Sequence, residues 1–347
     1  MAEARGGTGP IRARFDERAL AAWMAESIAG FAGPMTVEQF AGGQSNPTYR
    51  LRTPERDYVL RRKPPGALLK GAHAVDREYR VIAALHAVDF PVPRPLGLCL
   101  DEGVIGTIFY VMEMIAGRTV WDTAFPDVPR ETRPLYFDAM NAAIARLHSL
   151  DPAAIGLADY GRPGNYFERQ IARWSRQYLG DEAAGRVPAM DRLVEWLPAH
   201  VPPGDETAIV HGDFRCDNLL FHPAEPRVVA VLDWELSTLG HPLADFAYHL
   251  MVYRMPPGYS TGLAGLDLAA LNIPGEADYV AAYCRRTGRD GIPDLDFYVA
   301  FSLFRLAAII HGIKGRLIRG TASSPQAAEA AAQLDGIADL ALRQTRR

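Results

Sequence analysis

Cysteine is scarce in this chain. Its 347 residues include only three cysteines, Cys99, Cys216 and Cys284, and they lie far apart. An odd number of widely spaced cysteines argues against a disulfide framework and against a cysteine-rich metal site. It is typical of a protein that works in a reducing compartment, so we expect a cytoplasmic location.

Several other features are missing as well. The net charge is −4, so no overall basic field indicates a nucleic-acid partner. The first residues lack the apolar core of a signal peptide. No segment reaches about 18 uninterrupted apolar residues, so we expect no membrane span. The most apolar stretch, residues 301–313, is broken by Arg305 and His311 and reads as a buried helix. No G-x-x-x-x-G-K-[ST] sequence is present, which disfavours a P-loop enzyme.

Hydrophobic periodicity predicts two lobes of different composition. The expected fold class is α+β, with a small antiparallel β-sheet lobe over residues 1–116 and a mostly helical lobe over residues 117–347. Gly117 breaks the pattern between them and reads as a hinge. The first lobe is predicted to contain helices over 15–31 and 74–88 and strands over 35–40, 48–52, 58–63, 92–100 and 107–115. The second is predicted to contain helices over 134–150, 166–179, 190–197, 243–253, 277–286, 295–318 and 325–343, the last as an alanine-rich surface helix. Two strands within 209–233 are expected to flank a loop.

That loop carries the most informative sequence. It reads His211-Gly-Asp213-Phe-Arg-Cys-Asp-Asn218, and a second acid, Asp233, ends the apolar run that starts at Val228. Phosphoryl transfer from a nucleotide needs a carboxylate for the acceptor hydroxyl, and an amide oxygen and a second carboxylate for magnesium. Asp213 is the candidate catalytic residue, although a turn aspartate would look the same in isolation.

Asn218 and Asp233 are the candidate magnesium ligands, because magnesium prefers oxygen donors and takes few from the protein. A capping role is the alternative for Asn218, and a carboxylate beside a core must be paired or bind metal. Arg215 is either a cation for the transferred phosphate or a surface residue. His211 and Asp245 are expected to brace the loop, and Gly212 to let it turn tightly.

A second set of candidates lies in the first lobe. In the loop Gly42-Gly43-Gln-Ser45-Asn46, backbone amides around Gly43, Ser45 and Asn46 could cover phosphates, although Gly-Gly also marks ordinary hairpins. Arg61 and Lys63 share one strand face with Val59. A cation there could hold nucleotide phosphates and pair with Glu78 on the next helix. A solvated strand face is the alternative.

Taken together, these motifs resemble the aminoglycoside phosphotransferase family of kinase-like small-molecule phosphotransferases. The resemblance covers roughly residues 35–320, and its most specific parts are His-Gly-Asp-x-x-x-x-Asn and Leu-Asp-Trp-Glu. A closer resemblance is to the kinase-like domain that precedes the dehydrogenase in acyl-CoA dehydrogenase family members ten and eleven. Residues 166–174, 211–223 and 231–245 carry it.

The resemblance implies a bilobal protein-kinase-like fold that uses ATP and Mg²⁺. It implies the catalytic role for Asp213, the metal roles for Asn218 and Asp233, and the helix glutamate role for Glu78. Residues 111–115 match the segment whose backbone holds adenine, which gives Glu113 and Ile115 as nucleotide-binding residues. The family's strand lysine is replaced by Arg61, with Lys63 nearby, so the sequence leaves open which of the two grips the phosphates.

The acceptor is expected to be a small molecule with a hydroxyl group. Only 11 residues separate Asp233 from Asp245, too few for an activation segment that seats a peptide. Arg169, Arg173 and Arg176 share one helix face and could seat an anionic or acyl substrate, or could be solvated and paired with Glu168 or Asp181. The closer resemblance implies a hydroxy fatty acid or its CoA thioester.

Two alternatives stay open at this point. The protein could be a kinase for an aminoglycoside, a macrolide or a sugar alcohol, or a non-catalytic nucleotide-binding or partner-binding module. The choice between ATP and GTP and the oligomeric state are also not determined by the sequence.

Overall fold

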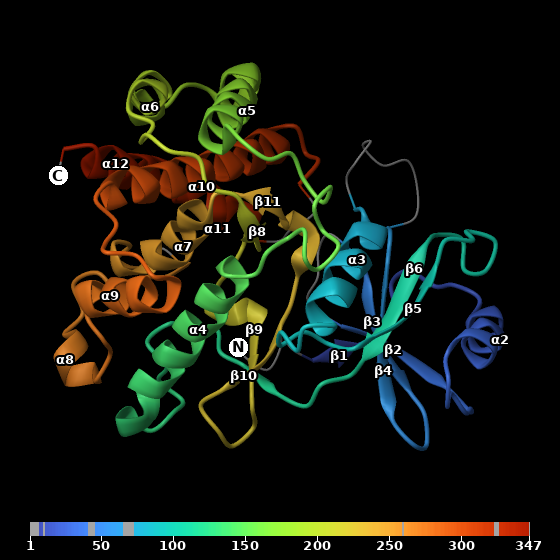
Figure 1. The fold of residues 1–347 in the computed structure, drawn as a ribbon. Coiled ribbons are helices and arrows are strands. Elements are labelled where there is room, and N and C mark those ends of the chain that lie inside the picture. Colours follow the sequence, from blue (N-terminus) through green and yellow to red (C-terminus); the bar gives the residue numbers. More distant parts are fainter. Residues whose placement is uncertain are drawn as a thin grey trace. The chain divides into compact units, whose positions relative to one another are not determined.

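The computed structural model describes residues 7–9, 11–40, 46–64, 73–258, 260–322 and 326–346. The expected nucleotide-binding residues Gly43 and Ser45 lie outside these ranges. The chain divides into two compact units (Figure 1). The first comprises residues 1–121, 155–157 and 217–237, and the second comprises residues 122–154, 158–216 and 238–347.

The first unit is built on a six-stranded antiparallel sheet, as the alternating patterns predict. Tyr49, Leu51, Tyr58 and Leu60 point into its core with aromatic and aliphatic side chains that favour strands. In sheet order, the strands are β1 (Thr8–Gly9), β2 (Thr36–Phe40), β3 (Thr48–Arg52), β4 (Asp57–Arg62), β6 (Phe109–Glu113) and β5 (Pro95–Cys99).

The helices α2 (Glu17–Ser27) and α3 (Val75–His86) pack in the first unit with its larger sheet. Asp16 caps α2 by accepting the N–H groups of Arg18 and Ala19, and the buried face of this helix joins the core of the sheet. The helix α3 buries residues at spacings of three and four, and it contacts β5 and β6. Glu78 lies on this buried stripe, so its carboxylate faces the interior of the unit.

A second small sheet in the first unit pairs β7 (Arg118–Thr119), β9 (Leu219–Phe221) and β10 (Val228–Val231). The N–H of Val231 also donates to the carbonyl of Pro91 at 2.7 Å. These bonds explain why residues 217–237 group with the first unit, although the sequence pattern places them in the second lobe. A Cβ on Gly117 would lie 3.0 Å from the carbonyl oxygen of Phe221, so this glycine permits a close approach of two backbones. The lobe boundary between residues 116 and 117 stays a prediction.

The second unit is organised around the long helix α10 (Leu295–Ile318). By length and composition alone this helix could cross a membrane, but 72% of its apolar window is buried inside the protein. The packing is that of a core helix, which is what the sequence predicts for this segment. The helices that contact it are α5 (Tyr166–Gly180), α6 (Pro188–Ala199), α7 (Pro242–Leu250), α11 (Ala327–Ala332) and α12 (Leu334–Gln344) (Figure 1).

The alanine-rich tail differs from its prediction as a single surface helix. It forms two helices, and Leu334, Ile337, Ala338 and Ala341 of α12 are buried. Small alanine side chains let α12 lie close to α10, with which it makes an extensive contact. The other elements of this unit include α4 (Arg133–His148), α8 (Leu268–Leu271), α9 (Glu276–Thr287), β8 (Ala208–Val210), β11 (Thr238–Gly240), β12 (Pro257–Gly258) and β13 (Ser260–Thr261).

Candidate active site

The loop that follows β8 in the second unit is held by one buried carboxylate. Asp245, on α7, accepts the N–H of His211 at Oδ2 and the N–H of Gly212 at Oδ1, each at 2.8 Å. Gly212 has φ of +83°, a conformation that glycine adopts without steric cost. The two bonds fix consecutive peptide groups directly before Asp213, which is the bracing role expected for Asp245.

Asp213 itself has a defined set of neighbours. Its N–H donates to Nδ1 of His211 at 3.2 Å, so the imidazole supports the turn. Its Oδ1 lies 3.2 Å from Nε of Arg215, and its side chain is 23% exposed. Tyr248 hydrogen-bonds to Asp213, and burial together with this carboxylate raises the pKa of the tyrosine. Arg215 therefore meets the Asp213 carboxylate, which remains partly open to solvent.

Arg305, on α10, also contacts this loop, and the sequence did not predict a role for it. Its Nη2 donates to the carbonyl of Gly212 at 2.7 Å, and its guanidinium lies 5.1 Å from the ring centre of Tyr248 and 5.9 Å from that of Trp174. It is 9% exposed and forms no ion pair with any residue that the structure describes. The only sequence signal was a charge interrupting an apolar run.

A buried histidine supports the bracing carboxylate. Nε2 of His148, on α4, lies 3.1 Å from Oδ2 of Asp245, and Nδ1 lies 2.8 Å from the hydroxyl of Tyr283. Burial alone would raise the pKa of Asp245. The hydrogen bond from His148 and the interactions with His211 outweigh burial and hold that pKa below its ordinary value. Asp245 is therefore an ionised acceptor at neutral pH.

Asn218 and Asp233 lie at the same end of one antiparallel pair in the first unit. Leu219 is paired with Val231 in β9 and β10, and the N–H of Leu232 donates to the carbonyl of Asn218 at 2.8 Å. Asp233 has φ of +65° and ψ of +63°, a left-handed conformation that is uncommon for a residue other than glycine. Such strain is found most often at functional positions.

These two side chains suit magnesium. An amide oxygen and a carboxylate are hard donors, and the Asp233 side chain is 36% exposed, which leaves room for phosphate oxygens and water. Within the described ranges, no group of three or more His, Cys, Asp or Glu side chains could hold a metal ion. A site of the zinc type is therefore not formed by the described residues, whereas a sparse magnesium site fits.

Arg61 on β4 connects this end of the hairpin to α3. Its Nε lies 2.7 Å from Oε2 of Glu78, and its Nη2 lies 2.7 Å from Oδ1 of Asp233 and 3.6 Å from Oε2 of Glu235. Burial would lower the pKa of Arg61, but the carboxylates of Glu78 and Asp233 outweigh it and raise that pKa. Lys63 lies beyond the end of β4. Of these two cations, Arg61 is the one that contacts Glu78 and Asp233.

The Glu78 carboxylate has further donors. Nδ2 of Asn46 donates to its Oε1 at 2.6 Å, and the hydroxyl of Tyr110 donates to its Oε2 at 3.2 Å. Burial raises the pKa of Glu78, and the charge of Arg61 opposes that shift. Asn46 is fully buried, so its side chain supports Glu78.

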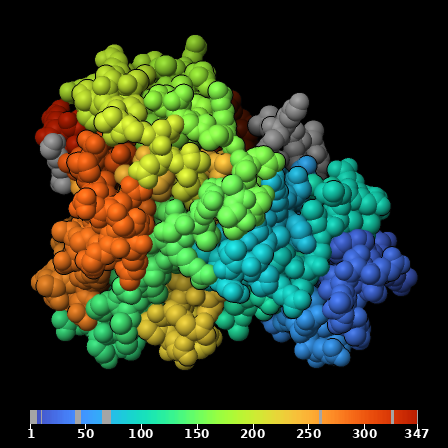
Figure 2. Space-filling model, in the orientation of Figure 1, coloured from blue at the N-terminus to red at the C-terminus, as the bar shows by residue number. Residues whose placement is uncertain are grey.

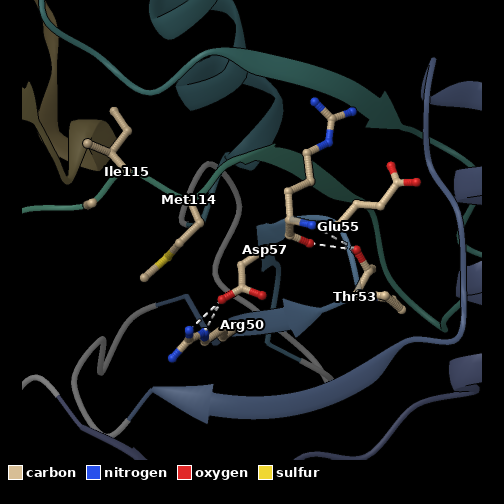
Figure 3. A pocket seen from close by; sticks show the side chains of 9 residues that line it. Arg50, Thr53, Glu55, Asp57, Met114 and Ile115 are labelled. Atoms are coloured by element: carbon tan, nitrogen blue, oxygen red, sulfur yellow. Dashed lines mark hydrogen bonds and ion pairs between the residues drawn. The ribbon is translucent and has the colours of Figure 1, made fainter.

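The segment expected to hold adenine lies at the edge of a hollow in the first unit. Ile115 lines it with Met114, opposite Arg50 and Asp57 (Figure 3). Those two charged residues pair with each other across neighbouring strands. The backbone N–H of Arg94 donates to Oε1 of Glu113 at 2.9 Å. The adenine-binding role of Glu113 and Ile115 stays a prediction.

The arginines on α5 form no ion pair with a described residue. Arg169 donates to the carbonyl of Arg162 at 2.6 Å, and the guanidinium of Arg173 lies 5.0 Å from the ring centre of Trp174. Asp181, which could have paired with this face, instead pairs with Arg319. Arg173 and Arg176 are exposed, and Figure 2 shows α5 and α6 at the surface of the second unit.

The chain has the expected α+β, protein-kinase-like fold. Residues 36–298 match the phosphotransferase enzyme family, known as APH. The chain belongs to this family.

Its relatives extend the comparison. Mouse acyl-CoA dehydrogenase family member 10 is 44% identical over 311 residues, which cover 89% of this chain and 29% of the relative. Acyl-CoA dehydrogenase family member 11 of Gallus gallus is 43% identical over 354 residues, which cover 98% of this chain and 45% of the relative. The chain thus spans less than half the length of these relatives. The expected resemblance to both is confirmed.

Solved structures confirm the fold. A crystal structure from Ralstonia eutropha JMP134, provisionally assigned as an aminoglycoside phosphotransferase, has a TM-score of 0.89 and 52% identity, covering 96% of this chain and 99% of that one. The aminoglycoside phosphotransferase APH(4)-Ia, in a ternary complex with ADP and hygromycin B, has a TM-score of 0.61 at 14% identity. It covers 94% of this chain and 98% of its own, and at that identity it shows the fold alone.

Proposed function

We propose that this protein uses ATP and Mg²⁺ to transfer the γ-phosphoryl group to a hydroxyl of a small molecule. Membership of the phosphotransferase enzyme family supports the reaction class. The observation that carries the proposal is the placement of Asn218 and Asp233 at one end of the β9–β10 pair, beside the Arg61–Glu78 ion pair. Oxygen donors for a divalent ion next to a cation suit the phosphates of a nucleotide.

Each residue has a proposed role in the transfer. Asp213 orients the acceptor hydroxyl and takes its proton, while the hydroxyl oxygen bonds to the γ-phosphorus and the bond from that phosphorus to the ADP oxygen breaks. Asn218 and Asp233 hold Mg²⁺, which neutralises charge on the phosphates. Asp245 acts through the loop backbone as a positioning residue. Arg215 keeps two proposed uses, because it contacts Asp213 and could also reach the transferred phosphate.

For the acceptor we propose a hydroxyacyl compound, either a hydroxy fatty acid or its CoA thioester. The names of the acyl-CoA dehydrogenase family relatives support an acyl substrate. The exposed arginines of α5 and the buried Arg305 beside the Asp213 loop favour an acceptor with anionic or carbonyl groups over a polycation. The three free, buried cysteines fit a reducing cytoplasm.

A second candidate acceptor is an aminoglycoside. It is favoured by the 52% identity to the Ralstonia eutropha structure that is provisionally assigned to the aminoglycoside phosphotransferases. Such polycations are best bound by an acidic pocket, and the arginines of α5 and Arg305 do not supply one.

The deciding experiment is mass spectrometry of products. The protein is incubated with ATP, Mg²⁺ and a pool of hydroxyacyl-CoAs, free hydroxy acids, aminoglycosides and macrolides. A phosphorylated hydroxyacyl product establishes the proposal, and a phosphorylated antibiotic replaces its acceptor class. The Asp213→Ala variant is expected to lose the product while it still binds nucleotide. Glu225→Ala, which removes an exposed acid in the turn between β9 and β10, is the matched control and should keep full activity. Undiminished turnover by Asp213→Ala would refute the catalytic assignment.

A further inference from the structure

Arg61 does more than replace a lysine, because its guanidinium reaches two carboxylates at once. Nε contacts Glu78 and Nη2 contacts Asp233, each at 2.7 Å. An ammonium group is a single point charge, whereas the planar guanidinium presents donors along two edges. In the described part of the chain, its third nitrogen, Nη1, has no recorded partner. Arg61 therefore ties the helix carboxylate to the proposed metal ligand.

Arg61 is surrounded by acidic side chains. Three carboxylates, of Glu78, Asp233 and Glu235, lie within 3.6 Å of its guanidinium. Gathered carboxylates of this kind favour a bound divalent cation. Yet the Asp233 oxygen that such an ion needs is in contact with Nη2 of Arg61.

We propose that Arg61 is an internal counter-ion of Asp233 and competes with Mg²⁺ for its carboxylate. In the absence of nucleotide, Arg61 occupies Oδ1 of Asp233 and weakens the binding of free metal. When the metal and the nucleotide arrive together, Asp233 binds the ion and the released arm of Arg61 donates to a phosphate oxygen, while Nε stays with Glu78. The exchange makes metal binding depend on nucleotide. This inference rests on the proposed function.

Burial explains why the anchor is Glu78 and the exchangeable contact is Asp233. The Glu78 side chain is 2% exposed and has Asn46 and Tyr110 as additional donors. The Asp233 side chain is 36% exposed. Separating a buried pair leaves an uncompensated charge, whereas a partly exposed carboxylate is solvated when its partner moves away.

The test measures metal binding without nucleotide. Free Mn²⁺ is followed by electron paramagnetic resonance during titration of the full chain and of Arg61→Met. The variant should bind Mn²⁺ on the order of tenfold more tightly, a typical size for coupling between two ligands of one site. Its affinity for a magnesium complex of a non-hydrolysable ATP analogue should fall about tenfold, the loss expected for one hydrogen bond to a charged group. Opposite signs in the two titrations distinguish competition from general damage.

Three further variants make the result decisive. Arg61→Lys keeps a cation for Glu78 but loses the second arm, so it should also bind Mn²⁺ more tightly, even if Arg61→Met does not fold. Arg52→Met removes a cation from the same sheet that pairs with Glu38, and it should leave Mn²⁺ affinity unchanged. Adding Asp233→Asn to Arg61→Met should abolish the gain.

The possible failures are separable. If Arg61→Lys or a folded Arg61→Met binds free Mn²⁺ no more tightly than the unaltered protein, competition is overturned while the proposed phosphotransfer stands. If Asp233→Asn alone changes neither Mn²⁺ binding nor binding of the magnesium–nucleotide complex, the metal assignment in the proposed function fails instead.

Discussion

His148 and Asp245 form a buried pair, with Nε2 of the histidine 3.1 Å from Oδ2 of the aspartate and both side chains 1% exposed. Asp245 in turn accepts the N–H groups of His211 and Gly212. The position of Asp213 therefore depends on a residue of α4 that has no recorded contact with Asp213. In this arrangement His148 is a positioning residue and acts through Asp245.

Replacing His148 with glutamine should lower kcat on the order of tenfold and leave the KM for nucleotide nearly unchanged. The reason is that Asp245 loses a charge-stabilising partner and holds the loop less firmly, and loops misplaced by small distances lose rate. The free energy of unfolding should fall by about 1–3 kcal/mol, the cost of a disrupted buried hydrogen bond. Steady-state kinetics and urea denaturation check both effects. His200→Gln, at an exposed histidine of the same unit, should change neither quantity.

The Asp233→Asn variant should need a higher Mg²⁺ concentration for half-maximal activity, because an amide oxygen is a weaker ligand for a hard cation than a carboxylate. Asn218→Ala should also raise the Mg²⁺ concentration for half-maximal activity, but by less, because it removes an uncharged oxygen ligand. Magnesium titrations at saturating ATP compare the two. A larger shift for Asn218→Ala would contradict the assignment of Asp233 as the main ligand.

Arg305 offers a separate test of the acceptor. Arg305→Met should raise the KM for an acidic acyl acceptor on the order of tenfold, since the variant loses a buried cation beside the loop. It should also lower kcat, because Gly212 loses the donor to its carbonyl. Nucleotide affinity should stay the same. Arg305→Lys keeps the positive charge, so its KM should lie between those of Arg305→Met and the unaltered protein. Its kcat should stay close to that of Arg305→Met. Equal KM values for all three proteins would exclude a contact between Arg305 and the acceptor.

The parts of the molecule that could be predicted from sequence depend on local patterns. The strand predicted over 48–52 is β3, the one predicted over 58–63 lies within one residue of β4, and α10 has the bounds predicted for it, 295–318. Asn218 and Asp233 were expected to act together. Their placement is local too, because β9 and β10 are joined by a short turn and the pairing of Leu219 with Val231 brings the two ends together.

The long-range contacts could not be predicted in the same way. Arg305 binds a carbonyl 93 residues away, His148 lies 97 residues from Asp245, and Arg61 lies 172 residues from Asp233. Single-residue patterns carry no information about which distant element a buried cation or imidazole will face, because that depends on tertiary packing. The choice between Arg61 and Lys63 was open for the same reason, because local alternation does not show which of the two cations meets Glu78 and Asp233.

A last prediction concerns stability in acid. Burial lowers the pKa of His249 to about 4, and burial likewise lowers the pKa of His241 to about 4. An unfolded chain holds its histidines near a pKa of about 6.5. Between those values the unfolded chain binds protons that the folded chain does not, so unfolding takes up protons and stability falls as the pH falls. The stabilisation is fully present above about pH 6.5. It is lost progressively toward pH 4.

The variant His249→Gln isolates one of these groups. Nε2 of His249 lies 2.6 Å from the hydroxyl of Tyr279, so glutamine retains a polar partner without a titrating ring. The unaltered protein should lose on the order of 3 kcal/mol through His249 alone between pH 6.5 and pH 4, and the variant should lose correspondingly less. Urea denaturation at half-unit pH steps measures the slope, with His200→Gln as the exposed control. An identical slope in His249→Gln would mean that groups other than His249 take up the protons on unfolding, and it would contradict the assignment.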